Sequence, residues 1–216
     1  MELHSKDRFK KVPITDIAIS KVPYICYKGM NDGQNDILYR LARLVLMTAQ
    51  QENDSNEVAL TIDLDDLESG IGTQKGNEHE IVIGADTDSY HLIRAGKKTA
   101  IVHNHPSTQT LSMQRKFLIR AGKKTAIVHN HPSTQTLSMQ DIHLFMSNDP
   151  VRVIVVVSNQ GVVHYLMKDS NFDFGTACDL YNSCVSDLTR ESSAREKYNA
   201  ALEFLAHCTE AGLYYH

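Results

Sequence analysis

One segment of the chain occurs twice, letter for letter. The string LIRAGKKTAIVHNHPSTQTLSMQ fills 92–114 and returns at 118–140. Two copies at this spacing are too few for a repeat array. One position in a β-sheet can hold a single TAIVH strand, so the other copy has to be added at an edge, refolded or extruded. The sequence therefore predicts a domain interrupted by a duplicated segment, whether that duplication is natural, engineered or an accident of sequence assembly.

The composition is that of an ordinary globular protein, with 42% hydrophobic and 22% charged residues among 216. A net charge of -4 argues against nucleic acid as the main partner, because phosphate binding needs clustered positive charge. The N-terminal residues are too charged for a signal peptide, and no stretch approaches the roughly 18 apolar residues of a membrane span. Four cysteines without a C-x-x-C pair fit a reducing compartment. We expect a cytoplasmic protein without membrane contact; a fragment of a secreted effector is the alternative, and the oligomeric state is left open.

Four segments carry hydrophobic residues at three- and four-residue steps, which predicts amphipathic helices. The first covers 35–48. The second begins near Ser138, a residue type that caps helices, and ends at Pro150. Two more helices follow Asp169. Residues 1–33 mix short apolar pieces with prolines and glycines and are predicted to hold little regular structure.

Short apolar runs rich in β-branched residues predict the strands. They lie at 58–64, at 80–85, in TAIVH, at 151–158 and at 162–168. The turn signal NQG joins the last two into a hairpin, and the glycine-rich stretch 66–77 predicts a loop. This order of elements predicts a mixed α/β (α+β) domain.

His129 and His131 stand two residues apart at the end of the predicted strand of the second copy. Alternate strand residues point to the same side, so both imidazoles can reach one ion while Asn130 points away. Asp141 lies in the first turn of the following helix, where its carboxylate can turn back. Two imidazoles, one carboxylate and an open position are the composition of a catalytic zinc site. Ser138 and Asp141 also match the S-x-x-D capping box, and both roles can hold together.

The two copies differ in the residue that follows them. The first copy has the same H-x-H pair, but Arg115 stands where the second copy has Asp141. A guanidinium group cannot ligate zinc. We therefore expect 118–141 to enter the sheet beside the strand 80–85, with 92–117 as a peripheral insertion.

The string TAIVHNHPS, followed by S-x-x-D, resembles the signature E…H-x-H-P…S-x-x-D of the JAMM (MPN+, or JAB) zinc metallopeptidases. The wording HNHPS is most similar to the RadC-like and toxin-associated bacterial branch. The resemblance covers roughly 76–168. Its visible departure is that six residues separate His131 from Ser138, where the common pattern has seven. It implies a JAB/MPN-like (cytidine-deaminase-like) fold, in which a mixed sheet is flanked by helices.

Together these observations predict three parts of the chain. We expect an N-terminal helical or irregular extension over 1–70 and a C-terminal helical extension over 169–216. Between them, 71–168 is predicted to form the JAB/MPN-like metallopeptidase domain that contains the duplicated segment.

The resemblance also implies zinc-dependent hydrolysis of an amide bond. Zinc (Zn2+) would be held by His129, His131 and Asp141, and would polarise a water molecule and lower its pKa toward ~7. Ser138 would hydrogen-bond the oxyanion of the tetrahedral intermediate. The implied partner is a peptide or an isopeptide-linked protein.

The family uses an upstream glutamate as general base. In this chain Glu78 is the predicted base, which would take a proton from the water and pass it to the leaving amine; Glu80, on the same strand face, is the alternative. Two other functions stay open beside the hydrolase. One is an MPN-like interaction module whose site is impaired, and the other is a RadC-like, DNA-associated protein.

Overall fold

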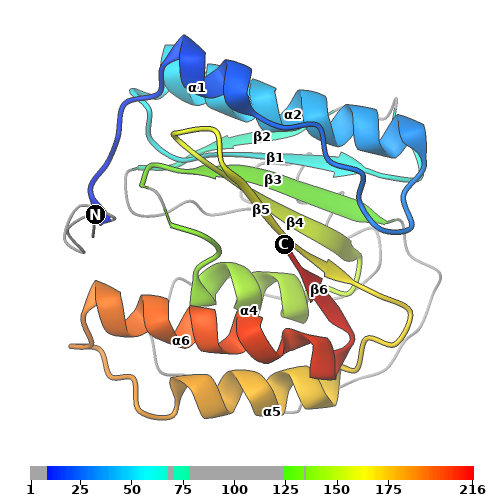
Figure 1. The fold of residues 1–216 in the computed structure, drawn as a ribbon, viewed down its shortest axis with the longest axis vertical. Coiled ribbons are helices and arrows are strands. Elements are labelled where there is room, and N and C mark those ends of the chain that lie inside the picture. The colour runs from blue at the N-terminus through cyan, green and yellow to red at the C-terminus, as the bar shows by residue number, and fades with distance from the viewer. Residues whose placement is uncertain (1–8, 68–70, 78–123, 134) are drawn as a thin grey trace.

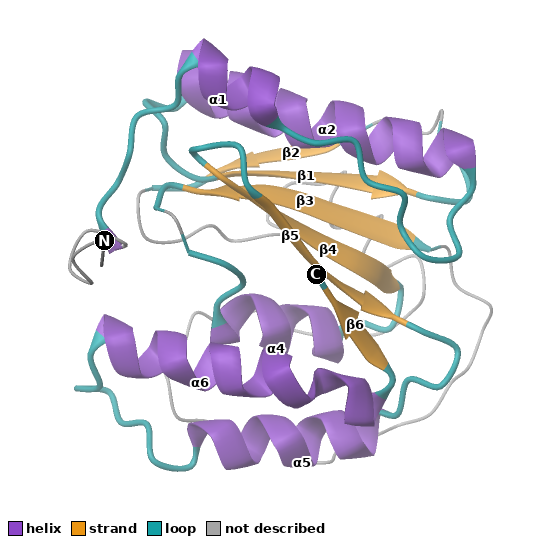
Figure 2. Ribbon diagram, in the orientation of Figure 1, coloured by secondary structure: helices purple, strands orange, loops and turns teal. Residues whose placement is uncertain are grey.

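The computed structural model describes residues 9–67, 71–77, 124–133 and 135–216. Within these ranges the chain forms three layers, with a β-sheet between two layers of helices (Figure 1). The helices are α1 (Asp16–Lys21), α2 (Asp32–Glu52), α4 (Met139–Ser147), α5 (Phe174–Val185), α6 (Ala194–His207) and the short 3-10 helix η2 (Cys208–Ala211). α1 and α2 cover one face of the sheet, and α4, α5 and α6 lie on the other side (Figure 2).

Among the described residues the sheet has six strands, in the order β2-β1-β3-β4-β5-β6. They are β1 (Val58–Asp63), β2 (Gly72–Lys75), β3 (Thr125–His131), β4 (Val151–Ser158), β5 (Val163–Lys168) and β6 (Leu213–Tyr215). β3 and β4 run parallel and are connected through α4, whereas the other neighbours are antiparallel. The sheet is therefore mixed, with a β-α-β crossover at its centre.

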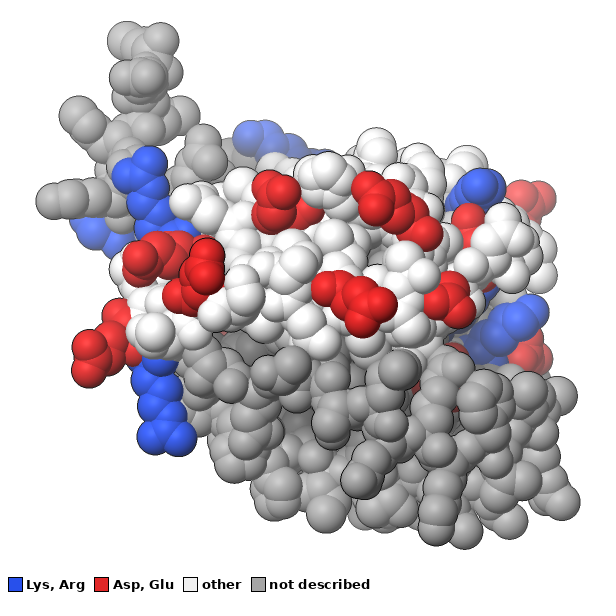
Figure 3. Space-filling model, turned by 90° about the horizontal axis from the view of Figure 1, so that it is seen from below, with Lys and Arg blue, Asp and Glu red and all other residues white. Residues whose placement is uncertain are grey.

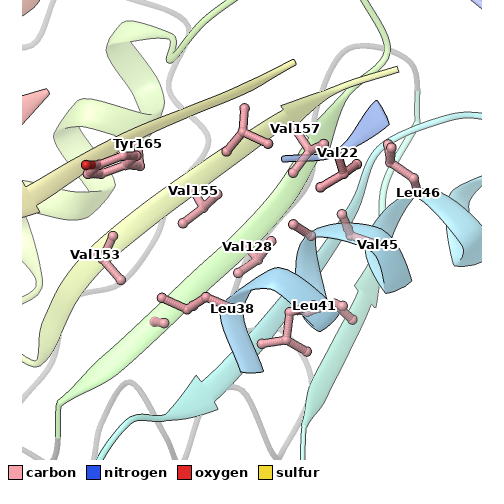
Figure 4. Packing of buried hydrophobic residues seen from close by; sticks show 14 of the residues in the cluster. Val22, Leu38, Leu41, Val45, Leu46, Val128, Val153, Val155, Val157 and Tyr165 are labelled. Atoms are coloured by element: carbon pink, nitrogen blue, oxygen red, sulfur yellow. The ribbon is translucent and has the colours of Figure 1, made fainter. Parts of the chain in front are cut away.

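Side chains alternate between the two faces of the sheet and build two hydrophobic clusters. On β3, Ala126 and Val128 belong to the cluster under α2, whereas Ile127 belongs to the cluster with α4, α5 and α6. Figure 4 shows part of the first cluster, where α2 meets the sheet: Leu38, Leu41, Val45 and Leu46 against Val128, Val153, Val155 and Val157. Because β4 is covered on both faces, nearly its whole length is apolar and buried.

Local sequence accounts for where α2 begins. Asn31 is its N-cap, and the Asn31 side chain accepts a hydrogen bond from the Gln34 N–H while Gln34 Oε1 accepts one from the Asn31 N–H. This capping box satisfies two backbone donors that the first turn leaves free. In the described ranges, no helix is both long and apolar enough to cross a membrane.

Most of the predicted elements are present. The sequence predicts α2, the β4–β5 hairpin and the helices α5 and α6 close to their observed positions, and TAIVH of the second copy forms β3. The predicted class is confirmed as a mixed α/β fold whose sheet is flanked by helices. The predicted strand 80–85 and the predicted insertion 92–117 lie outside the described residues.

Three short elements depart from the prediction. α1 forms within 1–33, where Thr15 caps it, and β2 forms within 66–77, where the sequence predicts a loop. β6 follows the last helices and pairs with β5. Each is a short piece stabilised by tertiary contacts with another element, which local patterns do not show.

The neighbours of β3 also differ from the prediction. β3 pairs with β1 on one side and with β4 on the other, so its predicted place beside a strand at 80–85 is wrong. The sheet also extends beyond the predicted domain 71–168, because β1 precedes that range and β6 follows it. Strand pairing therefore joins residues of all three predicted parts into one sheet.

Candidate metal centre

His129 and His131 extend from the end of β3 toward the α4 side of the sheet. Ile127 packs on that side of the sheet. Because every second residue of a strand points to the same face, His129 and His131 point there as well. Both side chains are buried, and their Nε2 atoms are 3.1 Å apart. The imidazoles therefore converge on one point, as the H-x-H spacing predicts, while Asn130 faces the α2 side.

Asp141 reaches the same point from the first turn of α4. Ser138 is the N-cap; its hydroxyl accepts a hydrogen bond from the Asp141 N–H at 3.2 Å, and Asp141 Oδ2 accepts one from the Ser138 N–H at 2.7 Å. The capping box turns the carboxylate back toward β3. There Oδ1 lies 3.2 Å from His129 Nε2, and Oδ2 lies 3.3 Å from His131 Nε2. The Asp141 side chain thus completes the capping box and is also the candidate ligand, as the sequence allows.

A fourth side chain, that of Glu57, also lies beside the histidines. Glu57 is the residue that directly precedes β1. β1 and β3 are antiparallel with Ala59 opposite His129, and continuing that register places Glu57 opposite His131. Glu57 Oε1 lies 3.8 Å from His131 Nε2. Glu57, His129 and His131 each offer a ligand atom, and these atoms lie within 4.8 Å of one another. All three residues are buried, so this is a compact group of potential metal ligands.

Glu57 is not among the site residues predicted from the sequence. One signal for it exists: Glu57 directly precedes the predicted strand 58–64, and alternation puts it on the same face as Ala59. What the sequence lacks is the pairing of β1 with β3, which brings that face to the histidines. The pairing joins residues about 70 positions apart and has no local signature.

Burial and charge shift the pKa values within the site. Burial lowers the pKa of His131, but the hydrogen bond and charge of Asp141, together with the charge of Glu57, outweigh it and raise the pKa to about 9. Burial raises the pKa of Asp141, but the charges and hydrogen bonds of His129 and His131 outweigh it and hold this pKa well below its ordinary value. The Asp141 carboxylate is therefore ionised at neutral pH and favours a positive charge beside it.

The donor chemistry fits a zinc ion. Zinc takes histidine nitrogens and carboxylate oxygens at about 2.0–2.2 Å in a tetrahedron, which separates the ligand atoms by roughly 3.3–3.6 Å. The Nε2 atoms of His129 and His131 are 3.1 Å apart, close to that separation, and Asp141 brings Oδ1 within 3.2 Å of the first and Oδ2 within 3.3 Å of the second. The His131 ring is also hydrogen-bonded to the backbone of Gln135, the type of outer contact that orients metal-binding histidines.

The outer contacts of the two histidines differ. Nδ1 of His129 is buried, and it has no hydrogen-bond partner among the described residues. The orientation of the His129 ring therefore depends on packing and on the group at its Nε2 atom. His131, by contrast, is held at both ends of its ring.

The predicted site residues that fall within the described ranges lie together: His129, His131, Ser138 and Asp141. The predicted base Glu78 and its alternative Glu80 lie outside the described residues, as does the first copy of the duplicated segment. The Ser138 hydroxyl donates to Asp141 Oδ2 at 2.7 Å, so in this structure its proton is directed at the carboxylate.

One face of the surface bears on the choice of partner. Seen from the side of α5, acidic side chains are spread over the described part of the face, and basic ones lie toward its margins (Figure 3). On this face the described residues form no continuous band of Lys and Arg. They offer no basic platform of the kind that binds a phosphate backbone.

No family model, curated protein or solved structure matches the chain. What the site can bind therefore has to be judged from its geometry. His129, His131 and Asp141 form a buried group at the end of the central strand β3, and the buried Glu57 lies beside them.

Proposed function

We propose that the protein is a zinc-dependent hydrolase of amide bonds, of the JAMM type and with a JAB/MPN-like fold. The observation that carries the proposal is the convergence of His129, His131 and Asp141, with Glu57 Oε1 at 3.8 Å from His131 Nε2. Three protein ligands leave the fourth tetrahedral position free for water, which is typical of catalytic zinc and not of structural zinc. The motif H-x-H-P…S-x-x-D supports the same class.

Each residue then has a defined task. His129, His131 and Asp141 would hold zinc, and zinc bound there supplies a Lewis acid that brings the pKa of a water molecule toward ~7. Glu57 accepts a proton from the water that attacks the carbonyl carbon. It then returns the proton to the amine nitrogen as the C–N bond breaks. Ser138 donates its hydroxyl proton to the oxyanion, exchanging its present bond to Asp141.

The proposed substrate is a peptide or an isopeptide-linked protein. A zinc-polarised water and a carboxylate base act on a carbonyl with a poor amine leaving group, and an amide offers both. The acidic groups on the α5 face give no support to a nucleic-acid substrate (Figure 3).

The role of Glu57 gives the first test. We expect Glu57→Gln to keep stoichiometric zinc and to lower kcat for hydrolysis of a fluorogenic peptide or a lysine-linked isopeptide by ~10²–10⁴-fold, the usual contribution of a general base. Glutamine keeps the shape of the side chain and removes its basicity. Zinc is measured by inductively coupled plasma mass spectrometry and kcat by steady-state kinetics.

Glu78→Gln and Glu80→Gln are the matched controls, since both are glutamates upstream of the motif. We expect both variants to keep their activity. A large loss in Glu78→Gln with none in Glu57→Gln would return the base to Glu78. Loss of zinc from Glu57→Gln would make Glu57 a metal ligand instead.

A further inference from the structure

The residue between the two histidines has its own set of buried contacts. Asn130 is fully buried on the α2 side, away from the ligand atoms. Its Oδ1 accepts a hydrogen bond from the Val58 N–H at 2.7 Å, and its Nδ2 donates to the Asn56 carbonyl oxygen at 3.2 Å. Asn56 and Val58 are the neighbours of Glu57 on either side. One side-chain amide therefore grips the backbone on both flanks of Glu57.

A second asparagine extends this contact. Asn159 follows β4, is almost wholly buried, and accepts a hydrogen bond at Oδ1 from Asn130 Nδ2 at 2.8 Å. Its Nδ2 donates to the carbonyl oxygens of Val12 at 2.7 Å and Ser55 at 2.9 Å. Its backbone N–H donates to the His131 carbonyl oxygen at 3.0 Å. The pair thus connects the end of β3 and the end of β4 to the segment that carries Glu57.

The position of this amide pair coincides with the end of the β1–β3 ladder. The paired residues run from Asp63 opposite Thr125 to Ala59 opposite His129. At Glu57 the backbone hydrogen bonds are made on the other side, to Gly76 and Asn77. Toward β3, the Asn130 side chain takes over where the ladder stops.

We propose that Asn130, supported by Asn159, is a positioning residue that fixes the Glu57 carboxylate against His131. This proposal rests on the proposed function, in which Glu57 transfers the proton. Because the Asn130 side chain touches none of the ligand atoms, it acts on the glutamate and not on metal binding. In the H-x-H motif the two histidines would thus bind the metal, and the residue between them would position Glu57.

The test replaces Asn130 by alanine and uses the duplicate as a matched control. Asn104 occupies the same place in the first copy, so Asn104→Ala removes the same group from an identical local sequence. For Asn130→Ala we expect kcat to fall by roughly 10–100-fold with KM and zinc content little changed, part of the ~10²–10⁴-fold that a base supplies. Asn104→Ala should behave as the wild type. In a Glu57→Gln background, Asn130→Ala should cause no further loss.

Two readouts do not depend on activity. Amide exchange followed by NMR should show faster exchange of the Val58 N–H in Asn130→Ala, because its acceptor is gone. A crystal structure of this variant should show Glu57 Oε1 moved from its 3.8 Å approach to His131. If Asn130→Ala does not fold, Asn159→Ala, which removes the outer anchor, should show the same changes at smaller size.

The outcomes separate the two proposals. If the wild type binds no zinc or hydrolyses no amide, the proposed function fails, and the position of Glu57 in the variant still decides the role of Asn130. The positioning role is overturned if Glu57 stays in place, if kcat is unchanged, or if zinc is lost together with activity.

Discussion

One buried residue outside the candidate metal centre is a lysine, whose amine is rarely found in a protein interior. Lys168, at the end of β5, is 5% exposed, and its Nζ donates to the Asn148 carbonyl oxygen at 2.8 Å. The ammonium lies over the rings of Phe145 and Phe172, 4.9 and 5.0 Å from their centroids. Burial lowers the pKa of Lys168 to about 7. The folded protein thus holds this lysine near the boundary between its charged and neutral forms.

That pKa predicts a dependence of stability on pH. The folded value of about 7 lies below the ordinary 10.5, so between these pH values the unfolded state binds more protons and stability rises with pH. Lys168→Met keeps the aliphatic chain and removes the titration. Relative to this variant, the wild-type free energy of unfolding should increase by about 1–3 kcal/mol from pH 6 to pH 9, since one pKa unit corresponds to about 1.4 kcal/mol. Urea denaturation at both pH values measures this, and parallel pH profiles would contradict it.

At the scale of elements, long patterned segments were predictable and short ones were not. α2 and the β4–β5 hairpin show clear hydrophobic periodicity in the sequence, and both are present. α1, β2 and β6 are short, and each is stabilised by contacts with another element that cannot be predicted from its local sequence. The hairpin turn is one such contact, because Gly161 lies against the Ala18 carbonyl of α1.

The contact between the β4–β5 turn and α1 predicts how much stability two glycine substitutions should cost. Gly161 has φ 83°, and a Cβ there would collide with the Ala18 carbonyl oxygen. Gly29 has φ 73°, and apart from its chain neighbours no atom of the described residues lies within 4 Å of such a Cβ. Gly29→Ala should cost only the left-handed backbone penalty, about 1–2 kcal/mol. Gly161→Ala should cost about 2–4 kcal/mol, because α1 has to move as well. Equal losses in thermal or urea unfolding would show that the turn does not press on α1.

For the whole molecule, the sequence brings together four of the residues of the proposed site but does not indicate Glu57. His129, His131, Ser138 and Asp141 lie within a short stretch, so strand alternation and a helix cap bring them together without knowledge of the sheet. Glu57 joins them through the pairing of β1 with β3, a contact between distant parts of the chain. No periodicity encodes such a pairing, which depends on how all three layers assemble.

The arrangement of the whole sheet explains why the second copy of the duplicated segment, and not the first, supplies its central strand β3. A TAIVH strand in the middle of the sheet has to be followed by a helix and a parallel strand. The second copy meets this requirement directly, since β3 leads through α4 into β4. It also supplies Asp141, the third of the proposed ligands, where the corresponding residue after the first copy is Arg115. Metal binding should therefore depend on the second copy.

The duplication makes it possible to measure whether metal binding depends on the second copy. Native mass spectrometry of the purified, zinc-loaded protein should show one zinc ion per chain. The double variant His129→Ala with His131→Ala should show none, and Asp141→Ala should lose most of it, because each removes ligands from the convergent group. The identical change in the first copy, His103→Ala with His105→Ala, should leave one zinc ion bound. Two zinc ions in the wild type, or zinc that persists in the 129/131 variant and disappears from the 103/105 variant, would show that the second copy does not form the metal site.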